Sequence, residues 1–232
     1  MKYIFLLLYN FLEDSFHLRR IKNFLKTNIF FKKPIIFDIG AHKGKVTKAF
    51  FDLYKNAKVY SFEPNKSLIR IIKKNNPKKN LVLCNYALGE KKKEALININ
   101  DLDLTSSLSK VDKNSFYLKI KRLILGKKIN SSTQKVNIIT LDYFCIKQKI
   151  TKIDLIKVDV EGYEYMFLLG AKKIIKKTQY IIIEVQKNSM YKNYSRQKIE
   201  KFLKTNNFQL LKKFNFPFMF FQDRVYKNKK FN

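Results

Sequence analysis

Two neighbouring carboxylates, Asp159 and Glu161, follow the apolar run Ile153–Val158 and precede Gly162. The run predicts a strand buried on both faces, and glycine allows the chain to turn sharply after it. If strand alternation continued past the run, both carboxylates would point to the same side of the sheet. Such a pair could act as a general base toward a hydroxyl, as a hydrogen-bond acceptor, or as a ligand to a divalent metal.

Two further acidic residues lie near this pair in the expected fold. Glu184 ends the predicted strand Tyr180–Val185, which we expect to lie next along the sheet, so it could converge on the same site. Asp159, Glu161 and Glu184 are therefore the candidate ligands for a divalent metal. Glu164 falls in the first turn of the next expected helix, where the helix dipole stabilises a carboxylate. It is therefore a candidate for helix capping as much as for the site.

A loop with two glycines follows the first predicted strand, Ile35–Ile39, and opens a helix. Gly40 lets the chain turn sharply beside a ligand, and Gly44 does the same where the helix begins. Asp38 lies at the carboxyl end of the strand, where open α/β sheets bind their ligands. A dinucleotide site would need the spacing G-x-G-x-x-G, whereas this loop reads G-x-x-x-G with an acid in front. That pattern favours a zwitterionic cofactor without phosphate, and S-adenosylmethionine fits this description.

Glu63 lies nineteen residues after Gly44 and ends the predicted strand Lys58–Phe62. An acid about 20 residues beyond a glycine loop, at the tip of the neighbouring strand, is placed to accept both ribose hydroxyls of a nucleoside. Pro64 stops the strand and helps to fix the direction of the carboxylate. The alternative is a solvated acid at a strand end, and the spacing from the glycine loop makes it the weaker interpretation.

The elements that must position these residues alternate between strands and helices from residue 34 onward, which is typical of a parallel α/β domain. The predicted strands are Ile35–Ile39, Lys58–Phe62, Leu81–Tyr86, Ile153–Val158, Tyr180–Val185, Phe208–Phe214 and Phe218–Tyr226. The predicted helices are Val46–Tyr54, Ser67–Asn75, Tyr163–Lys176 and Ser195–Asn206. Between about 90 and 135 the rhythm loosens into an insertion, in which Ala95–Asn100 and Val136–Thr140 could pair as a hairpin or as edge strands.

Composition limits the class of protein. With 46% hydrophobic residues, the 232-residue chain can bury a proper core, and wholesale disorder is excluded. The formal net charge of +31 suggests a nucleic-acid partner. We discount this reading because Lys greatly outnumbers Arg and the Lys residues are spread along the whole chain. Cys84 and Cys145 both lie in apolar runs and are expected to be reduced and buried, and no Cys/His cluster suggests zinc.

The N-terminal region is expected to form a helical extension over residues 1–33, ahead of a methyltransferase domain over 34–232. Its first nine residues are apolar but far short of the roughly 20 that span a membrane. Leu18, Ile21, Phe24 and Leu25 alternate with basic residues in a helical rhythm, which predicts a helix that packs on the domain. The alternative is weak peripheral contact of residues 1–30 with the inner face of an anionic membrane. We therefore expect a cytoplasmic protein, and the sequence carries no information on its oligomeric state.

Taken in order, these segments resemble the FkbM family of methyltransferases, which has the class I S-adenosylmethionine-dependent fold. The resemblance covers roughly residues 34–186, and the Asp-Val-Glu-Gly element at Asp159 is its most distinctive member. The segments that carry it are Phe37–Gly44, Phe62–Asn65, Asn85–Gly89, Ser106–Leu108, Thr140–Asp142, Asp154–Gly162, Gly170–Ala171 and Ile183–Glu184.

The resemblance implies a Rossmann-like α/β fold: a mostly parallel seven-stranded sheet with helices on both faces and an antiparallel C-terminal strand. It also implies O-methylation of a hydroxyl on a sugar, a glycan or a small natural product, as in polysaccharide biosynthesis. Asp159 and Glu161 would stand at the reaction centre. The residues that would bind S-adenosylmethionine are Asp38, Gly40, Ala41, His42, Gly44, Glu63, Pro64, Asn85, Ala87 and Asp159.

One position departs from the family and two other functions compete. His42 stands where the family usually has Asn, so the contacts of the cofactor loop are in doubt although its identity is not. A methyltransferase acting on RNA or DNA is the first competitor, but base methylation commonly relies on a Pro-Pro element where this chain has Asp-Val-Glu-Gly. A non-catalytic S-adenosylmethionine-binding protein is the second, and the intact acidic residues argue against it.

Overall fold

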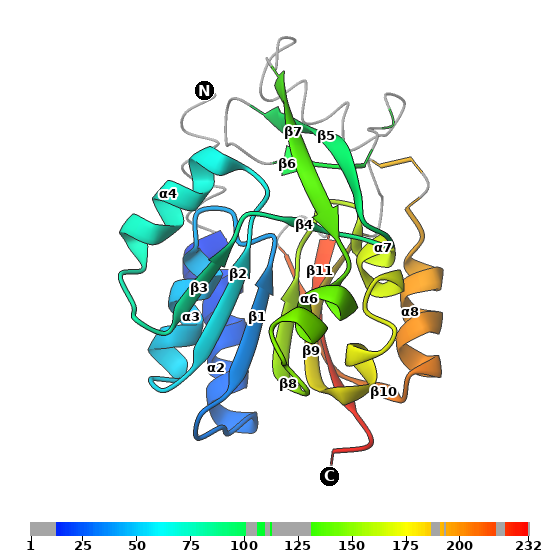
Figure 1. The fold of residues 1–232 in the computed structure, drawn as a ribbon. Helices are drawn as coiled ribbons and strands as arrows, with labels where there is room; N and C mark the ends of the chain where they lie inside the picture. Colours follow the sequence, from blue (N-terminus) through cyan, green and yellow to red (C-terminus); the bar gives the residue numbers. More distant parts are fainter. Residues whose placement is uncertain are drawn as a thin grey trace.

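The computed structural model describes residues 13–100, 106–109, 112, 131–186, 191–192, 194–216 and 221–231. Its centre is a seven-stranded sheet in the order β10-β11-β9-β8-β1-β2-β3 (Figure 1). The strands are β1 Ile35–Ile39, β2 Lys58–Phe62, β3 Leu81–Cys84, β8 Ile153–Val158, β9 Thr178–Gln186, β10 Phe208–Asn215 and β11 Phe221–Asn228. The pairs from β3 to β9 are parallel, and β11 is antiparallel to both of its neighbours. The expected fold class is therefore confirmed.

Helices cover both faces of this sheet (Figure 1). One face carries α2 Arg19–Asn28, preceded by the π-helical turn η1 Glu13–Leu18, together with α3 Lys45–Leu53 and α4 Lys66–Asn75. The other face carries α6 Leu141–Lys147, α7 Glu164–Leu169, the 3₁₀ turn η2 Ile174–Lys177 and α8 Arg196–Thr205. Because successive side chains of a strand point to opposite faces, each strand feeds two separate cores. In β1, Ile36 packs with α2 and α3, whereas Phe37 and Ile39 pack on the other side.

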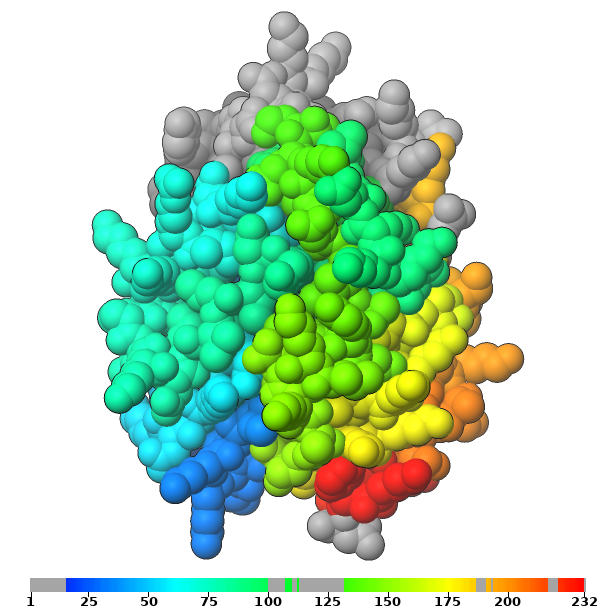
Figure 2. All heavy atoms as spheres, in the orientation of Figure 1, coloured from blue at the N-terminus to red at the C-terminus, as the bar shows by residue number. Residues whose placement is uncertain are grey.

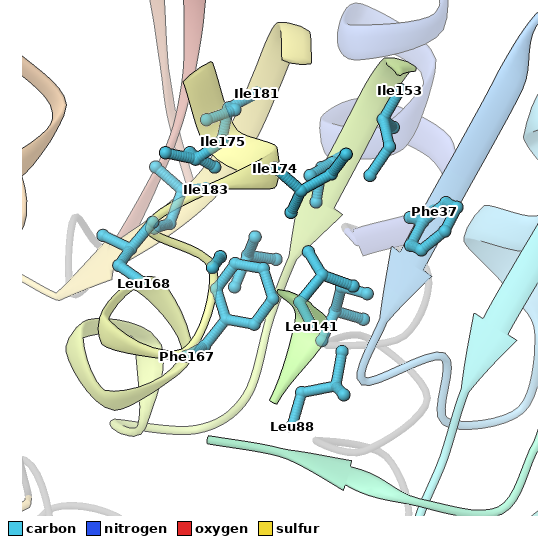
Figure 3. Packing of buried hydrophobic residues seen from close by; sticks show 14 of the residues in the cluster. Phe37, Leu88, Leu141, Ile153, Phe167, Leu168, Ile174, Ile175, Ile181 and Ile183 are labelled. Carbon is cyan, nitrogen blue, oxygen red and sulfur yellow. The ribbon is translucent and has the colours of Figure 1, made fainter. Parts of the chain in front are cut away.

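The larger core lies between the sheet and α6, α7 and α8. Phe167 and Leu168 of α7, Leu141 of α6 and Ile183 of β9 are almost fully buried there (Figure 3). Burying side chains of this size stabilises the fold by roughly 1.5–3 kcal/mol each. This cluster fixes the ends of β8 and β9, where the candidate site residues begin.

A second, smaller sheet stands at the carboxyl end of the parallel strands, in the order β4-β7-β5-β6 (Figure 1). It contains β4 Ala87–Leu88, β5 Lys93–Asn100, β6 Ser106–Ser107 and β7 Ser131–Ile139. The expected pairing of 95–100 with the segment at 136 is confirmed as antiparallel, with Ala95 opposite Val136. Much of the rest of the 90–135 insertion lies outside the described residues. In the space-filling view, residues of this sheet, in green, lie directly above α6 (Figure 2).

Some element boundaries differ from the sequence-based expectation. The long helix expected over 163–176 is wrong, because α7 ends at Leu169 and the chain re-forms as a short 3₁₀ turn. The break coincides with close packing at Gly170, where a Cβ would lie 1.9 Å from the carbonyl oxygen of Gly89. Asp142 then caps the second turn by accepting hydrogen bonds from the backbone N–H groups of Lys173 and Ile174. Strand β3 is also shorter than expected and ends at Cys84.

The N-terminal helix packs on the sheet, as its periodicity predicts. Ile21 and Leu25 of α2 are buried in the core shared with α3. Within the described residues, no helix is long and apolar enough to cross a membrane. Cys84 and Cys145 are both buried free thiols, and burial raises the pKa of each to about 12. Both are therefore uncharged members of the core.

Candidate active site

The loop after β1 turns three times through left-handed backbone conformations. Gly40 and Gly44 have φ of +82° and +78°, and His42 has φ of +49°. The N–H groups of Gly40 and Ala41 both donate to the carbonyl oxygen of Phe62, which ties the loop to the end of β2. Residues other than glycine seldom adopt a left-handed backbone conformation, but Asn, Asp and His are enriched among those that do. His42 therefore suits this left-handed position, as an Asn would.

Glu63 is buried at the end of β2, with 3% of its surface exposed. Its Oε2 accepts a hydrogen bond from the backbone N–H of His42, and its Oε1 accepts one from the N–H of Asn65, both at 2.9 Å. Burial raises the pKa of Glu63 to about 7, in spite of these two hydrogen bonds. The carboxylate thus joins the glycine loop to the end of β2, and it is not the solvated strand-end acid of the alternative interpretation.

The other predicted cofactor residues after β2 and β3 surround the same loop. Asn85 Nδ2 donates to the carbonyl oxygens of Glu63 and Pro64, each at 2.9 Å. Gln134 of β7 donates to the Pro64 carbonyl oxygen at 3.0 Å, so the second sheet also contacts this edge. Ala87 lies buried in β4. The strand ends that the sequence predicts as one site are therefore neighbours, and Gln134 is a contact that sequence reasoning missed.

Asp38 plays a more internal part than the sequence suggested. It is 1% exposed, and its Oδ2 accepts a hydrogen bond from Thr47 Oγ1 of α3 at 2.6 Å. Thr47 Oγ1 also lies 2.8 Å from Ser61 Oγ of β2. Burial raises the pKa of Asp38 to about 6, against the opposing effects of Thr47 and Lys157. In this structure Asp38 ties β1 to the start of α3, behind the loop that the sequence expected it to serve directly.

The acidic loop after β8 lies against the glycine loop. The backbone N–H of Asp159 donates to the Ile39 carbonyl oxygen at 2.9 Å, and a Cβ on Gly40 would lie 1.8 Å from the Asp159 carbonyl oxygen. The expected alternation of Asp159 and Glu161 does not apply, because β8 ends at Val158 and Glu161 has φ of +51°. Asp159 therefore directly follows β8, whereas Glu161 lies in a left-handed turn, and the two carboxylates do not share one strand face.

Glu161 is held by two contacts that the sequence did not reveal. Tyr191 OH donates to Glu161 Oε2 at 2.7 Å, and Ser107 Oγ of β6 donates to the Glu161 carbonyl oxygen at 2.7 Å. The ring of Tyr191 also packs on Gly162, where a Cβ would lie 2.4 Å from a ring carbon. Burial and the neighbouring Glu161 raise the pKa of Tyr191, so the phenol keeps its proton and remains a donor.

Glu164 stabilises the turn itself. It is 1% exposed, and its Oε1 accepts hydrogen bonds from the backbone N–H groups of Val160 and Gly162 at 3.3 and 3.1 Å. Burial raises its pKa to about 7, and Asp159 adds to the rise. Of the two roles open from the sequence, the contacts favour the structural one, since the carboxyl group closes the loop that carries Asp159 and Glu161.

A buried lysine links the acidic loop to the antiparallel edge of the sheet. Lys157 Nζ lies 3.2 Å from Asp159 Oδ2 and 2.8 Å from Asp223 Oδ1. Burial acts to lower the pKa of Lys157, but Asp159, Asp223 and Glu184 outweigh it and raise the pKa above its usual value. For Asp223, burial acts to raise the pKa, but Lys157 and His17 outweigh it and lower the pKa. Lys157, Asp223 and His17 are thus charged or polar groups that sequence reasoning missed, because they come from distant parts of the chain and meet only in the fold.

Glu184 lies on the strand next to Asp159, as the sequence predicted. Burial raises its pKa well above the usual value, and the charges of Asp159 and Glu161 add to the rise. No three Asp, Glu, His or Cys side chains among the described residues are arranged to hold a metal ion. Asp159, Glu161 and Glu184 are therefore close enough to interact electrostatically.

Known proteins resemble this chain in sequence and in fold. Residues 38–210 match the family described as the methyltransferase FkbM domain. The 2-O-methyltransferase NoeI of Sinorhizobium fredii is 25% identical over 167 residues, which cover 68% of this chain and 65% of that protein. The chain thus spans slightly less than two thirds of this relative.

Solved structures share the fold at low sequence identity. The fibrillarin/Nop5p complex matches with a TM-score of 0.51 at 12% identity, over 89% of this chain and 79% of that chain. A ribosomal protein L11 methylase from Lactobacillus delbrueckii subsp. bulgaricus matches with a TM-score of 0.49 at 12% identity, over 91% and 78%. At such identity the likeness to fibrillarin supports the fold alone, whereas the family match extends over most of the described chain. This chain belongs to the FkbM family of S-adenosylmethionine-dependent methyltransferases.

Proposed function

We propose that this enzyme methylates a hydroxyl oxygen on a sugar or natural-product acceptor, with Asp159 and Glu161 at the reaction centre. The observation that carries the proposal is the contact between the acidic loop and the glycine loop, in which the Asp159 backbone touches Gly40. A carboxylate at this junction lies between the cofactor loop and any acceptor that approaches the end of β8. The NoeI relative is named a 2-O-methyltransferase, which supports transfer to oxygen.

The glycine loop and Glu63 fit the cofactor. Neither Gly40 nor Gly44 has room for a Cβ, because the Asp159 carbonyl oxygen and the Asn76 side chain occupy that space. The loop therefore depends on glycine at both positions to keep its shape. Glu63 offers a buried carboxylate whose oxygens can accept hydroxyl hydrogen bonds from a ribose, and Asn85 borders it. S-adenosylmethionine supplies an electrophilic methyl group when bound. In the proposed assignment Glu63 holds the ribose and Asp38 supports the glycine loop from behind. The remaining residues of the cofactor site are Gly40, Ala41, His42, Gly44, Pro64, Asn85, Ala87 and Asp159.

The acceptor hydroxyl must lose its proton as the new C–O bond forms. The oxygen gains positive charge during transfer, so its proton becomes acidic and a neighbouring carboxylate can take it. Asp159 is the residue that we assign to this step, because its side chain is 36% exposed and Lys157 Nζ lies 3.2 Å from its Oδ2. Glu161, oriented by Tyr191, would then accept a hydrogen bond from the same acceptor. Alignment of the hydroxyl with the methyl group accounts for much of the remaining rate enhancement.

An acceptor screen with site variants tests this proposal. The protein is incubated with S-adenosylmethionine and a panel of monosaccharides, oligosaccharides and hydroxylated natural products, and S-adenosylhomocysteine release and O-methyl products are measured by mass spectrometry. We expect Asp159→Asn and Glu161→Gln to bind the cofactor and to lose transfer. Full turnover in both variants would show that the proposed reaction centre is wrong. Cofactor binding without transfer to any acceptor would favour a non-catalytic role instead.

The charge of the chain supports one competing acceptor, a nucleic acid. A net charge of +31 attracts any polyanion, and such attraction falls steeply with salt. Filter binding of the protein to RNA and DNA at increasing salt separates the two functions. Tight binding to one RNA, together with methylation of that RNA, would show that the acceptor is a nucleic acid. Weak binding without sequence preference would be consistent with the proposed sugar or natural-product acceptor.

We also infer that residues 34–232 form the methyltransferase domain and that 1–33 form its N-terminal extension, which is helical from Glu13 to Asn28; residues 1–12 lie outside the described residues. The burial of Ile21 and Leu25 against α3 supports an extension that docks on the domain rather than a separate unit. Limited proteolysis tests this, since a docked α2 is cut as slowly as the domain, and early cleavage near residue 30 would contradict the inference.

A further inference from the structure

A row of polar side chains crosses one face of the sheet at its carboxyl end. Lys157 and Asp159 are two residues apart along β8 and its end, so strand alternation aims them at the same face. Glu184 of β9 is paired with Asp223 of β11 in the antiparallel register. All four line one cavity under η1, α2 and α3, the face on which Ile36 and Ile182 are packed. A parallel sheet face is usually apolar, so this row is a local exception that needs a reason.

His17 of η1 closes the row from the N-terminal extension. It is 4% exposed, and its Nε2 lies 2.7 Å from Asp223 Oδ2. The rings of Phe216 and Phe221 meet it edge to face, with centroids 5.5 and 6.0 Å away. Its second ring nitrogen, Nδ1, is buried and has no hydrogen-bond partner among the described residues. Buried polar atoms in native proteins usually have a hydrogen-bond partner, because leaving one unpaired destabilises the fold.

The contact with Asp223 determines what Nδ1 can do. Asp223 is ionised because Lys157 and His17 lower its pKa, so it can only accept a hydrogen bond. His17 Nε2 must therefore carry the hydrogen in this pair, as the carboxylate fixes the tautomer of a neighbouring imidazole. In the neutral ring Nδ1 then holds a lone pair and is an acceptor. The partner that suits it is a donor such as a hydroxyl.

The cavity that His17 lines has room for such a group. Its volume is about 60 Å³, which accommodates a few water-sized groups or the edge of a small ring. Polar walls come from His17, Lys157, Asp159 and Glu184, and apolar walls come from residues that include Ile21, Ala49, Phe50 and Phe221. Asp159 belongs both to this cavity and to the junction with the glycine loop. The cavity therefore begins at the proposed reaction centre and ends at the N-terminal extension.

We propose that this cavity binds the edge of a polyol acceptor, such as two neighbouring ring carbons with their hydroxyls, and that His17 Nδ1 accepts a hydrogen bond from one of them. The inference rests on the proposed function, because it names the chemical class of the acceptor that the proposed reaction centre would methylate. A polyol presents both C–H surface and O–H groups, and the cavity offers both kinds of wall. His17 is then a specificity-determining residue that the extension contributes, and Asp223 is the positioning residue that fixes its tautomer.

Nitrogen NMR of the histidine rings tests the subsite without any transfer reaction. The chain has only two histidines, so spectra of the full chain and of His42→Gln identify the signals of His17. We expect His17 to carry its hydrogen on Nε2, and its Nδ1 signal to shift on titration with propane-1,2-diol. Ala49→Leu, which fills the cavity from α3, should abolish that shift. A hydrogen on Nδ1, no response to the diol, or an equal response in Ala49→Leu would each overturn the proposal.

Kinetics of His17→Gln test the same subsite during transfer. Glutamine can still donate to Asp223 through its amide, but it lacks the second ring nitrogen that we assign to the acceptor. The substrate is an acceptor that the enzyme methylates in the screen. We expect the KM for this acceptor to rise about tenfold or more, and the affinity for the cofactor to stay unchanged. A tenfold rise corresponds to about 1.4 kcal/mol. Lys26→Gln, an exposed position on α2, is the matched control and should change neither value.

The two tests separate this inference from the proposed function. A wild-type KM in His17→Gln, with the melting temperature retained, would overturn the subsite even though the enzyme methylates its acceptor. If no acceptor in the panel is methylated, the proposed function fails, and the diol titration still decides whether His17 binds a hydroxyl.

Discussion

The α-carbon of Gly40 lies so close to the backbone of Asp159 that a side chain on Gly40 would place its Cβ 1.8 Å from the Asp159 carbonyl oxygen. Two loops that are more than a hundred residues apart in sequence therefore touch through their main chains. The loop after β1 is proposed to hold the cofactor, and the loop after β8 is proposed to carry out the chemistry. Their contact joins the two proposals, because it places the proposed reaction centre directly beside the proposed cofactor loop.

Gly40→Ala should therefore separate the two loops. The added Cβ clashes with the Asp159 carbonyl group, and alanine at φ +82° adds about 1–2 kcal/mol of backbone strain. We expect the affinity for S-adenosylmethionine to fall at least tenfold, together with a lower melting temperature. Isothermal titration calorimetry measures the affinity, and Lys55→Ala, an exposed position after α3, is the control. Wild-type affinity in Gly40→Ala would contradict the proposed cofactor loop.

Glu63→Gln tests the proposed ribose contact. The carboxylate accepts hydrogen bonds from the N–H groups of His42 and Asn65, whereas the amide of glutamine can accept only one of them and presents a donor to the other. We expect the dissociation constant for S-adenosylmethionine to rise by about tenfold to a hundredfold. Glu90→Gln changes an exposed glutamate and should leave it unchanged. Equal affinities in the two variants would remove Glu63 from the cofactor site.

The free energy of unfolding should depend on pH through Glu164. Its pKa is raised from 4.5 to about 7, so the folded chain keeps a proton that the unfolded chain releases. The stabilisation is therefore fully present below about pH 4.5 and is lost as pH rises through 7. Glu164→Gln removes this contribution, and the amide oxygen can still accept from Val160 and Gly162. At roughly 1.4 kcal/mol per pKa unit, we expect the variant to gain on the order of 3 kcal/mol relative to wild type between pH 4.5 and 8.

Urea denaturation across that pH range measures the difference. Glu90→Gln supplies the control, since Glu90 is exposed and its replacement should not change the slope with pH. A stability difference between Glu164→Gln and wild type that stays constant with pH would contradict the raised pKa of Glu164.

Much of the fold could be predicted from the sequence because local patterns determine it. The run from Ile35 to Ile39 is apolar and short, and it forms β1 with the same bounds. Lys58–Phe62 and Ile153–Val158 also match in full. The glycine loop was recognisable because a left-handed turn at Gly40 needs a residue without a Cβ. Such signals lie within a few residues of one another and need no tertiary contact.

What could not be predicted depends on contacts between distant residues. The helix expected to run through Gly170 ends at Leu169, and Gly170 packs closely against the carbonyl group of Gly89, a contact between distant residues. Glu161 leaves the strand face because β8 ends at Val158, which alternation alone cannot show. Tyr191 and His17 gave no signal, since a single aromatic or histidine has no spacing to recognise. Their roles arise only when Glu161 and Asp223 meet them in the folded chain.

Tyr191→Phe tests whether the orientation of Glu161 matters for transfer. The variant keeps the ring that packs on Gly162 but removes the hydroxyl that donates to Glu161 Oε2. We expect kcat to fall about tenfold with an unchanged affinity for S-adenosylmethionine, because one hydrogen bond to a charged group contributes roughly 1.5–3 kcal/mol. Tyr143→Phe, on the exposed surface of α6, is the control. If kcat is unchanged, Glu161 does not need this donor and its place at the reaction centre loses support.

Lys157→Met should lower the free energy of unfolding more than the replacement of an exposed lysine near the same strand. Lys157 is buried between Asp159 and Asp223, and its removal leaves the buried carboxylate of Asp223 without its ammonium partner. Losing one member of a buried ion pair typically costs 3–5 kcal/mol, because the remaining charge is uncompensated. Lys152→Met is the matched control: its ammonium lies 3.7 Å from Asp154, is 66% exposed, and should contribute at most about 1 kcal/mol.

Adding Asp223→Asn to Lys157→Met removes the stranded charge and keeps an acceptor for His17, so we expect the double variant to recover part of the loss. Urea denaturation gives the three free energies, and a cost for Lys157→Met no larger than for Lys152→Met would mean that the buried pair contributes nothing to the fold.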